Sequence, residues 1–440
     1  MERIDMKISE FFNNDYVDQA SYDNLRKIAS LVDGQKNASR KILYTILEKN
    51  VKEKIKVSQL GSKVAEFAEY LHGSLDGVIV NLGQDFPGSN NLPLLQKKGN
   101  FGTRFSQEAS APRYIYTYGT PQFFELFKKD DTAILKHQFF EGQQIEPMYY
   151  VPTLPMLLIN GSEGVSSGFA QKILPRNPDD VKKYITTKLN GKEPKTPLTP
   201  FYQGFKGTIE VGENSSQWLI KGVLKIIGVN KVEITEVPIG YDLKSYIAVL
   251  DDLEERKVIQ SYRDKSEDDN FYFEVTVPSK FLKEWPEEEL MNKLKLIKKV
   301  SENYTVIDEN NKIVVYDCAK QILDHYIRVK RASLADRKEH MKGRLDEEIR
   351  YDYSKYLFIK MIVDNTLIVS KRKKADIVKD LDKVKDILSK DDSYDYLLNM
   401  NIMSLTEERM NKLESDIKQK KSELDTLIKK SIEQLWAEEL

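Results

Sequence analysis

The apolar positions between residues 57 and 71 repeat with the period of an α-helix. One helical face is formed by apolar residues three or four positions apart: Val57, Leu60, Val64, Phe67 and Leu71. His72-Gly73 interrupts this pattern, and Ser74 is a suitable N-cap for a second helix over 75–82. The sequence therefore predicts two helices joined by a glycine turn, the outline of a helix-turn-helix, although any helical hairpin gives the same pattern.

The middle of the chain changes character several times. Residues 87–125 are interrupted repeatedly by Pro and Gly and predict a loop-rich segment. Residues 150–175 are apolar and predict β-structure, and the Pro-, Gly- and Lys-rich stretch 188–205 indicates a boundary. Short alternating patterns dominate 205–315, where strands are expected at 208–211 and 231–238.

After Tyr316 the chain becomes charged and helical. Long helices are expected over 320–360 and 405–435, and a smaller helical insert over 361–404. Two apolar stripes lie on the long helices: Leu334, Met341, Leu345 and Ile349 on the first, and Met410, Leu413, Ile417, Leu424, Leu427 and Ile428 on the second. The pattern predicts an antiparallel coiled coil with a globule at its tip, in an α+β multidomain chain.

Composition excludes several classes of protein. The 68 Lys and Arg nearly balance the 69 Asp and Glu, which argues against a uniformly basic surface. Charge is clustered, however, because 24–66 holds ten basic and four acidic residues. One cysteine and four scattered histidines give no disulfide framework and no metal-ligand spacing. Without a signal peptide or an apolar run of about 18 residues, a soluble intracellular protein without membrane contacts is expected.

One dipeptide in the loop-rich segment carries candidate chemistry. Arg113-Tyr114 follows the glycine-rich run 99–102. A phenol is a poor nucleophile until a neighbouring cation stabilises its phenolate, and the same cation can neutralise a phosphate under attack. The pair therefore suits attack on a phosphodiester. Arg350-Tyr351 is a second such pair in a helical region, so the dipeptide alone does not decide.

Several separated motifs together resemble the DNA breakage-reunion subunit of type IIA topoisomerases, the gyrase A and topoisomerase IV A family. Within it, the likeness is greatest to the medium subunits of T-even-type phage topoisomerases. The matching phrases stand in the family's order: Arg26, Asp33-Gly34-Gln35-Lys36 with Arg40-Lys41 and Tyr44, His72-Gly73, Gly99-Asn100-Phe101-Gly102 with Arg113-Tyr114, Leu154–Gly164, Ile173 before Leu174-Pro175, Glu236-Val237-Pro238, and 397–406. Asn37 and Ser39 depart from a family proline and histidine, which puts the shape of that turn in doubt.

The resemblance implies a role for each matched residue. Tyr114 forms a 5′-phosphotyrosyl link to DNA, Arg113 clamps the scissile phosphate, and His72 and Arg26 complete the catalytic set. Four residues would bind DNA, either along its backbone or, for the isoleucine, as a wedge in the minor groove: Lys36, Arg40, Lys41 and Ile173. Asn160 would bind backbone near the gate or cap a turn. No metal ligand is expected in this chain.

The resemblance also implies domains and partners. It predicts an N-terminal arm (1–21), a winged-helix DNA-cleavage domain (22–198), an α+β tower (199–315), and a coiled coil with a C-gate dimerisation globule (316–440). The sequence shows neither a Gly-rich ATP loop nor the acidic cluster of a Toprim site. We therefore expect a homodimer working with ATPase and Toprim subunits that bind ATP and Mg²⁺. It would act on double-stranded DNA in the cytoplasm. If the protein is encoded by a phage, this is the cytoplasm of the bacterial host. Because the sequence ends after the coiled coil, relaxation and decatenation are expected rather than active supercoiling.

Two other classes remain open at this level. A non-catalytic DNA-binding scaffold would share the basic cluster and the wedge without needing Arg113-Tyr114 behind a Gly-Asn-Phe-Gly loop. A purely structural coiled-coil protein is disfavoured by the Pro- and Gly-rich stretch and the strand-rich middle. A covalent protein–DNA adduct separates the enzyme from both.

Overall fold

The computed structural model describes residues 7–440, with Ile402 described by its backbone alone. These residues form two compact units: the chain up to Lys330 together with Glu439–Leu440, and Arg331–Glu438. The fold is a mixture of helices and strands, as the sequence predicts. The part of the predicted N-terminal arm before residue 7 lies outside the described residues.

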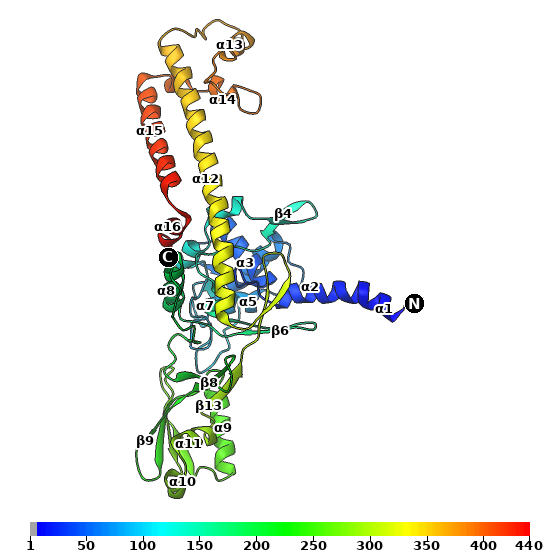
Figure 1. Cartoon of the computed structure of the whole chain (residues 1–440), viewed down its shortest axis with the longest axis vertical. Helices are drawn as coiled ribbons and strands as arrows, with labels where there is room; N and C mark the ends of the chain where they lie inside the picture. The colour runs from blue at the N-terminus through cyan, green and yellow to red at the C-terminus, as the bar shows by residue number, and fades with distance from the viewer. Residues whose placement is uncertain (1–6) are drawn as a thin grey trace. The chain divides into compact units, whose positions relative to one another are not determined.

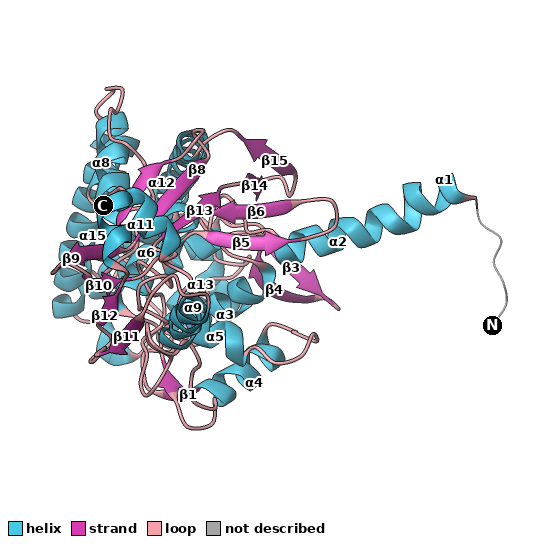
Figure 2. Cartoon of the chain, turned by 90° about the horizontal axis from the view of Figure 1, so that it is seen from below, coloured by secondary structure: helices cyan, strands magenta, loops and turns pink. Residues whose placement is uncertain are grey.

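The first unit begins with a nearly continuous helical rod that projects from its body (Figure 2). The rod consists of α1 (Ile8–Phe11), a π-helical turn (Phe12–Tyr16) and α2 (Val17–Lys27). Three helices follow and pack against one another: α3 (Asn37–Glu48), α4 (Val57–Phe67) and α5 (Asp76–Gly83). A short antiparallel pair, β1 (Ile55–Lys56) with β2 (Tyr116–Thr117), brings the predicted catalytic segment to the start of α4.

The predicted helix pair is confirmed with one correction. The apolar stripe is buried at Val57, Leu60 and Val64, and the helix ends at Phe67. Leu71 does not extend it, because Glu69 adopts a left-handed φ of 50° and Leu71 is 73% exposed. The second helix begins at Asp76, whose backbone N–H donates to the Ser74 hydroxyl at 3.1 Å.

The prediction of β-structure was wrong for residues 156–160, which form α7 (Met156–Asn160). Residues 156–159 are all buried, so the apolar run has no polar face from which a period could be read. The strands begin after this helix, as the hairpin β5 (Ser162–Val165) and β6 (Ala170–Ile173). The other elements around this body are α6 (Pro121–Leu126), a 3₁₀ turn (Lys129–Ala133), β3 (His137–Phe140), β4 (Gln143–Pro147), α8 (Pro178–Leu189), β14 (Tyr304–Ile307) and β15 (Ile313–Tyr316).

The strand-rich middle forms two antiparallel sheets, and the strands expected at 208–211 and 231–238 are confirmed as β7 and β10. One sheet has the order β13 (Ile297–Ser301), β8 (Gln217–Lys221), β7 (Thr208–Val211). The other has the order β11 (Ser261–Asp264), β12 (Phe273–Thr276), β10 (Lys231–Glu236), β9 (Val223–Ile226). The helices of this region are α9 (Leu243–Glu255), α10 (Ser279–Glu284) and α11 (Glu287–Lys293). Alternate residues of β10 and β12 point into a core with Tyr246 and Leu250 of α9.

A buried carboxylate ties the segment that follows β6 to the first of these sheets. Glu302 accepts hydrogen bonds from the Arg176 guanidinium at 2.7 Å, the Trp218 indole at 2.7 Å, the Tyr304 hydroxyl at 2.6 Å and the Leu174 backbone N–H at 2.7 Å. Glu302 and Arg176 are both almost fully buried. A buried charge with several donors is stabilised only while all of them are present.

The second unit is built on two long helices. α12 (Ala319–Val363) enters it from the first unit, and α15 (Glu407–Lys429) runs alongside in the opposite direction (Figure 1). The direction follows from two contacts, Lys420 with Asp352 at 2.8 Å and Lys338 with the Lys430 carbonyl at 2.7 Å. Between them lie α13 (Lys374–Leu381), α14 (Asp395–Leu398) and a 3₁₀ turn (Ile402–Ser404), with a small apolar core, and α16 (Ile432–Ala437) follows. The predicted helical pair and helical insert are confirmed.

Candidate active site

The glycine-rich loop packs beside the Arg113-Tyr114 segment. Gly99 and Gly102 both have positive φ, 97° and 91°, and Phe101 between them is buried. A Cβ on Gly99 would lie 2.9 Å from the Ile115 side chain, and one on Gly102 would lie 2.5 Å from the Gln107 carbonyl. Both positions therefore require glycine, for conformation and for space.

The Tyr114 side chain projects from this loop into solvent and is not packed into the core. Its backbone N–H donates to the Ala111 carbonyl at 2.9 Å, while the next residue, Ile115, is buried and accepts from the Val57 N–H at 3.1 Å. The Tyr114 side chain is 68% exposed. Arg113 is exposed beside it, with its guanidinium carbon 5.0 Å from the centre of the Tyr114 ring. A phenol and a cation thus lie together on a loop whose backbone is held by hydrogen bonds.

Gly102→Ala is expected to reduce Tyr114 chemistry strongly, because the added methyl group must displace the Gln107 backbone. Strain of this kind costs about 1–3 kcal/mol. Gly142→Ala is the matched control, since Gly142 also has a positive φ, 82°, but open space around its Cβ position. DNA-adduct formation and thermal unfolding of both variants measure the effect. Equal losses in the two variants would show that close packing at Gly102 is unimportant.

The predicted residues Arg26 and His72 meet through a residue that the sequence did not single out. The Tyr22 hydroxyl lies 2.5 Å from His72 Nε2, and the Arg26 guanidinium carbon lies 5.6 Å from the centre of the Tyr22 ring. Tyr70 also contacts the imidazole edge-on, at 5.9 Å between centroids. Among the described residues, no hydrogen bond or ion pair joins this group directly to Tyr114.

Lys36 is held against the β5–β6 hairpin. Its ammonium group donates to the Glu163 carbonyl at 2.6 Å, and burial lowers the pKa of Lys36. The departures at Asn37 and Ser39 do not disrupt the turn. Lys36 is the N-cap of α3, its N–H donates to the Ser39 hydroxyl at 3.1 Å, and that hydroxyl donates back to the Lys36 carbonyl at 3.0 Å.

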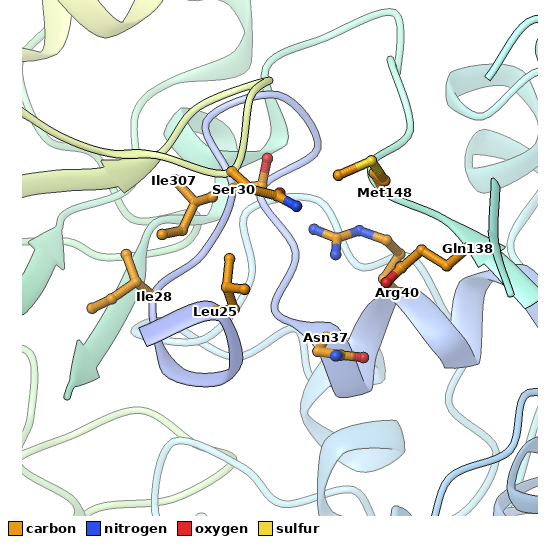
Figure 3. A pocket seen from close by; sticks show the side chains of 9 residues that line it. Leu25, Ile28, Ser30, Asn37, Arg40, Gln138, Met148 and Ile307 are labelled. Carbon is orange, nitrogen blue, oxygen red and sulfur yellow. The ribbon is translucent and has the colours of Figure 1, made fainter. Parts of the chain in front are cut away.

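Arg40 and Lys41 point into the protein, contrary to the expected contacts with flanking phosphates. Arg40 is 8% exposed and donates to both carboxylate oxygens of Asp33, at 2.7 and 3.1 Å. Figure 3 shows its guanidinium beside Ser30, among the side chains that line a pocket. Lys41 is buried and pairs with Glu146 at 2.8 Å. Because exposing either cation would leave a buried carboxylate unpaired, we assign both to the interior.

Ile173 and Asn160 are also engaged within the fold. Ile173 ends β6 and is 2% exposed, so its side chain would have to leave the core to enter a minor groove. The Asn160 amide exchanges two hydrogen bonds of 2.9 Å with the Leu92 backbone. Both bonds join Asn160 to a segment 68 residues away rather than to its own turn.

The sequence did not indicate two further polar residues that join segments around the site. Arg104 is buried directly after the glycine-rich run and donates to the carbonyls of Val237 at 2.9 Å and Tyr241 at 2.5 Å. Asn91 donates to three carbonyls and accepts one backbone N–H. For Arg104, the only signal in the sequence is its position two residues after the matched Gly-Asn-Phe-Gly motif. Tyr351 of the competing pair packs on Tyr396, and Arg350 pairs with Asp346.

Comparison with known proteins decides the family. The family model that describes the A subunit of DNA gyrase and topoisomerase IV matches residues 26–440. The chain belongs to this family. The mitochondrial DNA topoisomerase 2 of Dictyostelium discoideum is 33% identical over 98% of the chain and 34% of the relative. The DNA topoisomerase 2 of Saccharomyces cerevisiae is 31% identical over 99% of the chain and 34% of the relative.

The fold agrees with the family. A crystal structure of the Plasmodium falciparum topoisomerase II DNA-binding, cleavage and re-ligation domain matches with a TM-score of 0.89 and 33% identity. The match covers 98% of this chain and 63% of that one. The chain spans about a third of the length of its curated topoisomerase relatives. These relatives are eukaryotic, so the greater likeness to phage medium subunits stays a prediction.

Residues 7–440 show neither a metal-ligand cluster nor a membrane-spanning helix. No group of three or more His, Cys, Asp or Glu side chains is placed to hold a metal ion within that range. No helix there is both long and apolar enough to cross a bilayer.

Proposed function

We propose that this chain is the DNA-cleavage part of an ATP-dependent type II DNA topoisomerase. The observation that carries the proposal is the exposed Tyr114 beside Arg113, on a glycine-fixed loop, in a member of this family. The substrate is double-stranded DNA, and the reaction is transient double-strand breakage, strand passage and resealing. Relaxation and decatenation are the expected outcomes.

In the proposed reaction the Tyr114 phenol oxygen attacks a backbone phosphorus. The bond to the 3′ oxygen breaks, that oxygen takes up a proton, and a 5′-phosphotyrosyl link forms. Because one ester replaces another, the reverse attack reseals the strand without ATP. Arg113 neutralises the phosphate as charge builds, a contribution typical of preorganised cations. His72, Arg26 and Lys36 would bind the same or neighbouring phosphates.

The proposal includes partners. Two copies of Tyr114 are needed to cut both strands, so the chain would act as a homodimer. Mg²⁺ and ATP would bind mainly on ATPase and Toprim subunits, as the family resemblance implies. A split-subunit arrangement of the phage type, with a cytoplasmic location in the bacterial host, completes the proposal.

Reconstitution tests this function. The chain is mixed with a candidate ATPase/Toprim subunit, Mg²⁺ and supercoiled plasmid, and the reaction is quenched with detergent. We expect linear DNA covalently attached to this chain, and little cleavage by the chain alone. Tight, salt-sensitive DNA binding without an adduct would instead indicate a DNA-binding scaffold.

A further inference from the structure

The N-terminal helix α2 carries a tyrosine whose hydroxyl reaches the candidate active site. Tyr22 lies 2.5 Å from His72 Nε2, 50 residues further along the chain. Both side chains are exposed, and their ring centroids are 6.0 Å apart. Tyr70 also contacts the imidazole, which therefore packs against two phenol rings. An exposed histidine would otherwise rotate freely about its side-chain bonds.

Arg26 favours the hydroxyl as the donor in this contact. Its guanidinium lies over the Tyr22 ring, and a cation on the ring face strengthens the O–H as a hydrogen-bond donor. A neutral imidazole that accepts at Nε2 carries its proton on Nδ1. Within residues 7–440, His72 makes no hydrogen bond other than the one to Tyr22. The Nδ1–H therefore remains available to an external acceptor.

The position of Tyr22 is itself fixed by its neighbour. The Asp23 carboxylate accepts from the hydroxyls of Ser166 and Ser167, both at 3.0 Å, and from the Ser167 N–H at 3.1 Å. Lys27 pairs with it at 2.8 Å, and these donors, Lys27 first, lower the pKa of Asp23 to about 2. Helix α2 is thus attached to the β5–β6 hairpin one residue after the hydroxyl that meets His72 (Figure 2).

We propose that Tyr22 is a positioning residue for His72, whose hydroxyl fixes the imidazole with Nδ1–H directed to a DNA phosphate oxygen. This inference rests on the proposed function for its phosphate ligand. The hydrogen bond itself does not depend on that function. Arg26 acts on the imidazole through the same tyrosine.

The test combines a spectroscopic and a kinetic measurement on the full chain. Histidine is labelled with ¹⁵N, the His72 signals are identified by their loss in His72→Gln, and the protonated ring nitrogen is read at about pH 8.5. Tyr22→Phe keeps the ring and removes only the hydroxyl. Tyr16→Phe is the matched control, because Tyr16 is exposed to a similar extent on the same rod and its ring packs on Phe11 and Phe12.

We expect the Nδ1–H form in the unaltered chain and in Tyr16→Phe, and its loss in Tyr22→Phe. In the reconstituted cleavage reaction, Tyr22→Phe should slow adduct formation about tenfold, as expected for loss of one such hydrogen bond. It should have no further effect in a His72→Gln background. An unchanged tautomer, or normal cleavage by Tyr22→Phe, would overturn the proposal. Absence of any adduct with the unaltered chain would instead refute the proposed function, and the ¹⁵N result would still decide whether Tyr22 holds His72.

Discussion

Tyr114→Phe is expected to abolish covalent attachment of DNA, with a loss of at least about 10⁴-fold, because it removes the nucleophile itself. The substitution deletes one oxygen from an exposed ring, so folding and DNA binding should be unchanged. Arg113→Ala should cost less, about 10²–10³-fold, as for removal of one preorganised charge. Detergent-quenched plasmid cleavage with the partner subunit measures both losses.

Tyr118→Phe is the control for Tyr114→Phe, since Tyr118 lies four residues further on, beyond the short strand β2. It should leave adduct formation intact. Normal cleavage by Tyr114→Phe would show that another residue attacks the DNA. Loss of DNA binding together with cleavage would instead indicate a structural defect.

Glu302→Ala is expected to destabilise the first unit by about 3–5 kcal/mol, because it leaves the buried Arg176 guanidinium without a counter-charge. It also leaves the Trp218 indole and the Tyr304 hydroxyl without their acceptor. Thermal or denaturant unfolding of the full chain, followed by fluorescence, measures the change.

Glu210→Ala is the matched control for this prediction. Glu210 also pairs with a basic side chain, that of Lys221 at 2.7 Å, but the Glu210 side chain is 52% exposed. A surface pair contributes at most about 1 kcal/mol. Similar stability losses in the two variants would mean that the buried network around Glu302 is not important for the fold.

The sequence predicted the elements whose apolar period is strong. The stripe from Val57 to Val64, the strand β10 and the helical pair of the second unit each bury one face and leave the other more exposed. The failures lie where that contrast is missing. Met156–Ile159 is buried on every side, and Leu71 follows a left-handed residue that hydrophobic spacing cannot indicate.

The site was predictable to a different extent for each residue. Motifs pointed to Tyr114, Arg113, His72, Arg26 and Lys36, and the structure exposes the first three. The same motifs assigned Arg40, Lys41 and Ile173 to DNA, whereas their side chains are buried. A motif does not distinguish a basic residue that pairs with Asp33 in the interior from one that binds a phosphate on the surface. Tyr22 was missed because its partner is 50 residues away.

Mapping the residue that carries the DNA tests whether Tyr114 forms the covalent link. A detergent-trapped adduct is digested with nuclease and trypsin, and the modified peptide is sequenced by mass spectrometry. Trypsin cuts after Arg113 and Lys128, so the expected peptide begins at Tyr114 and also contains Tyr116 and Tyr118 as internal alternatives. We expect a nucleotide joined through its 5′ phosphate to Tyr114. A link to either neighbouring tyrosine, or through a 3′ phosphate, would contradict it.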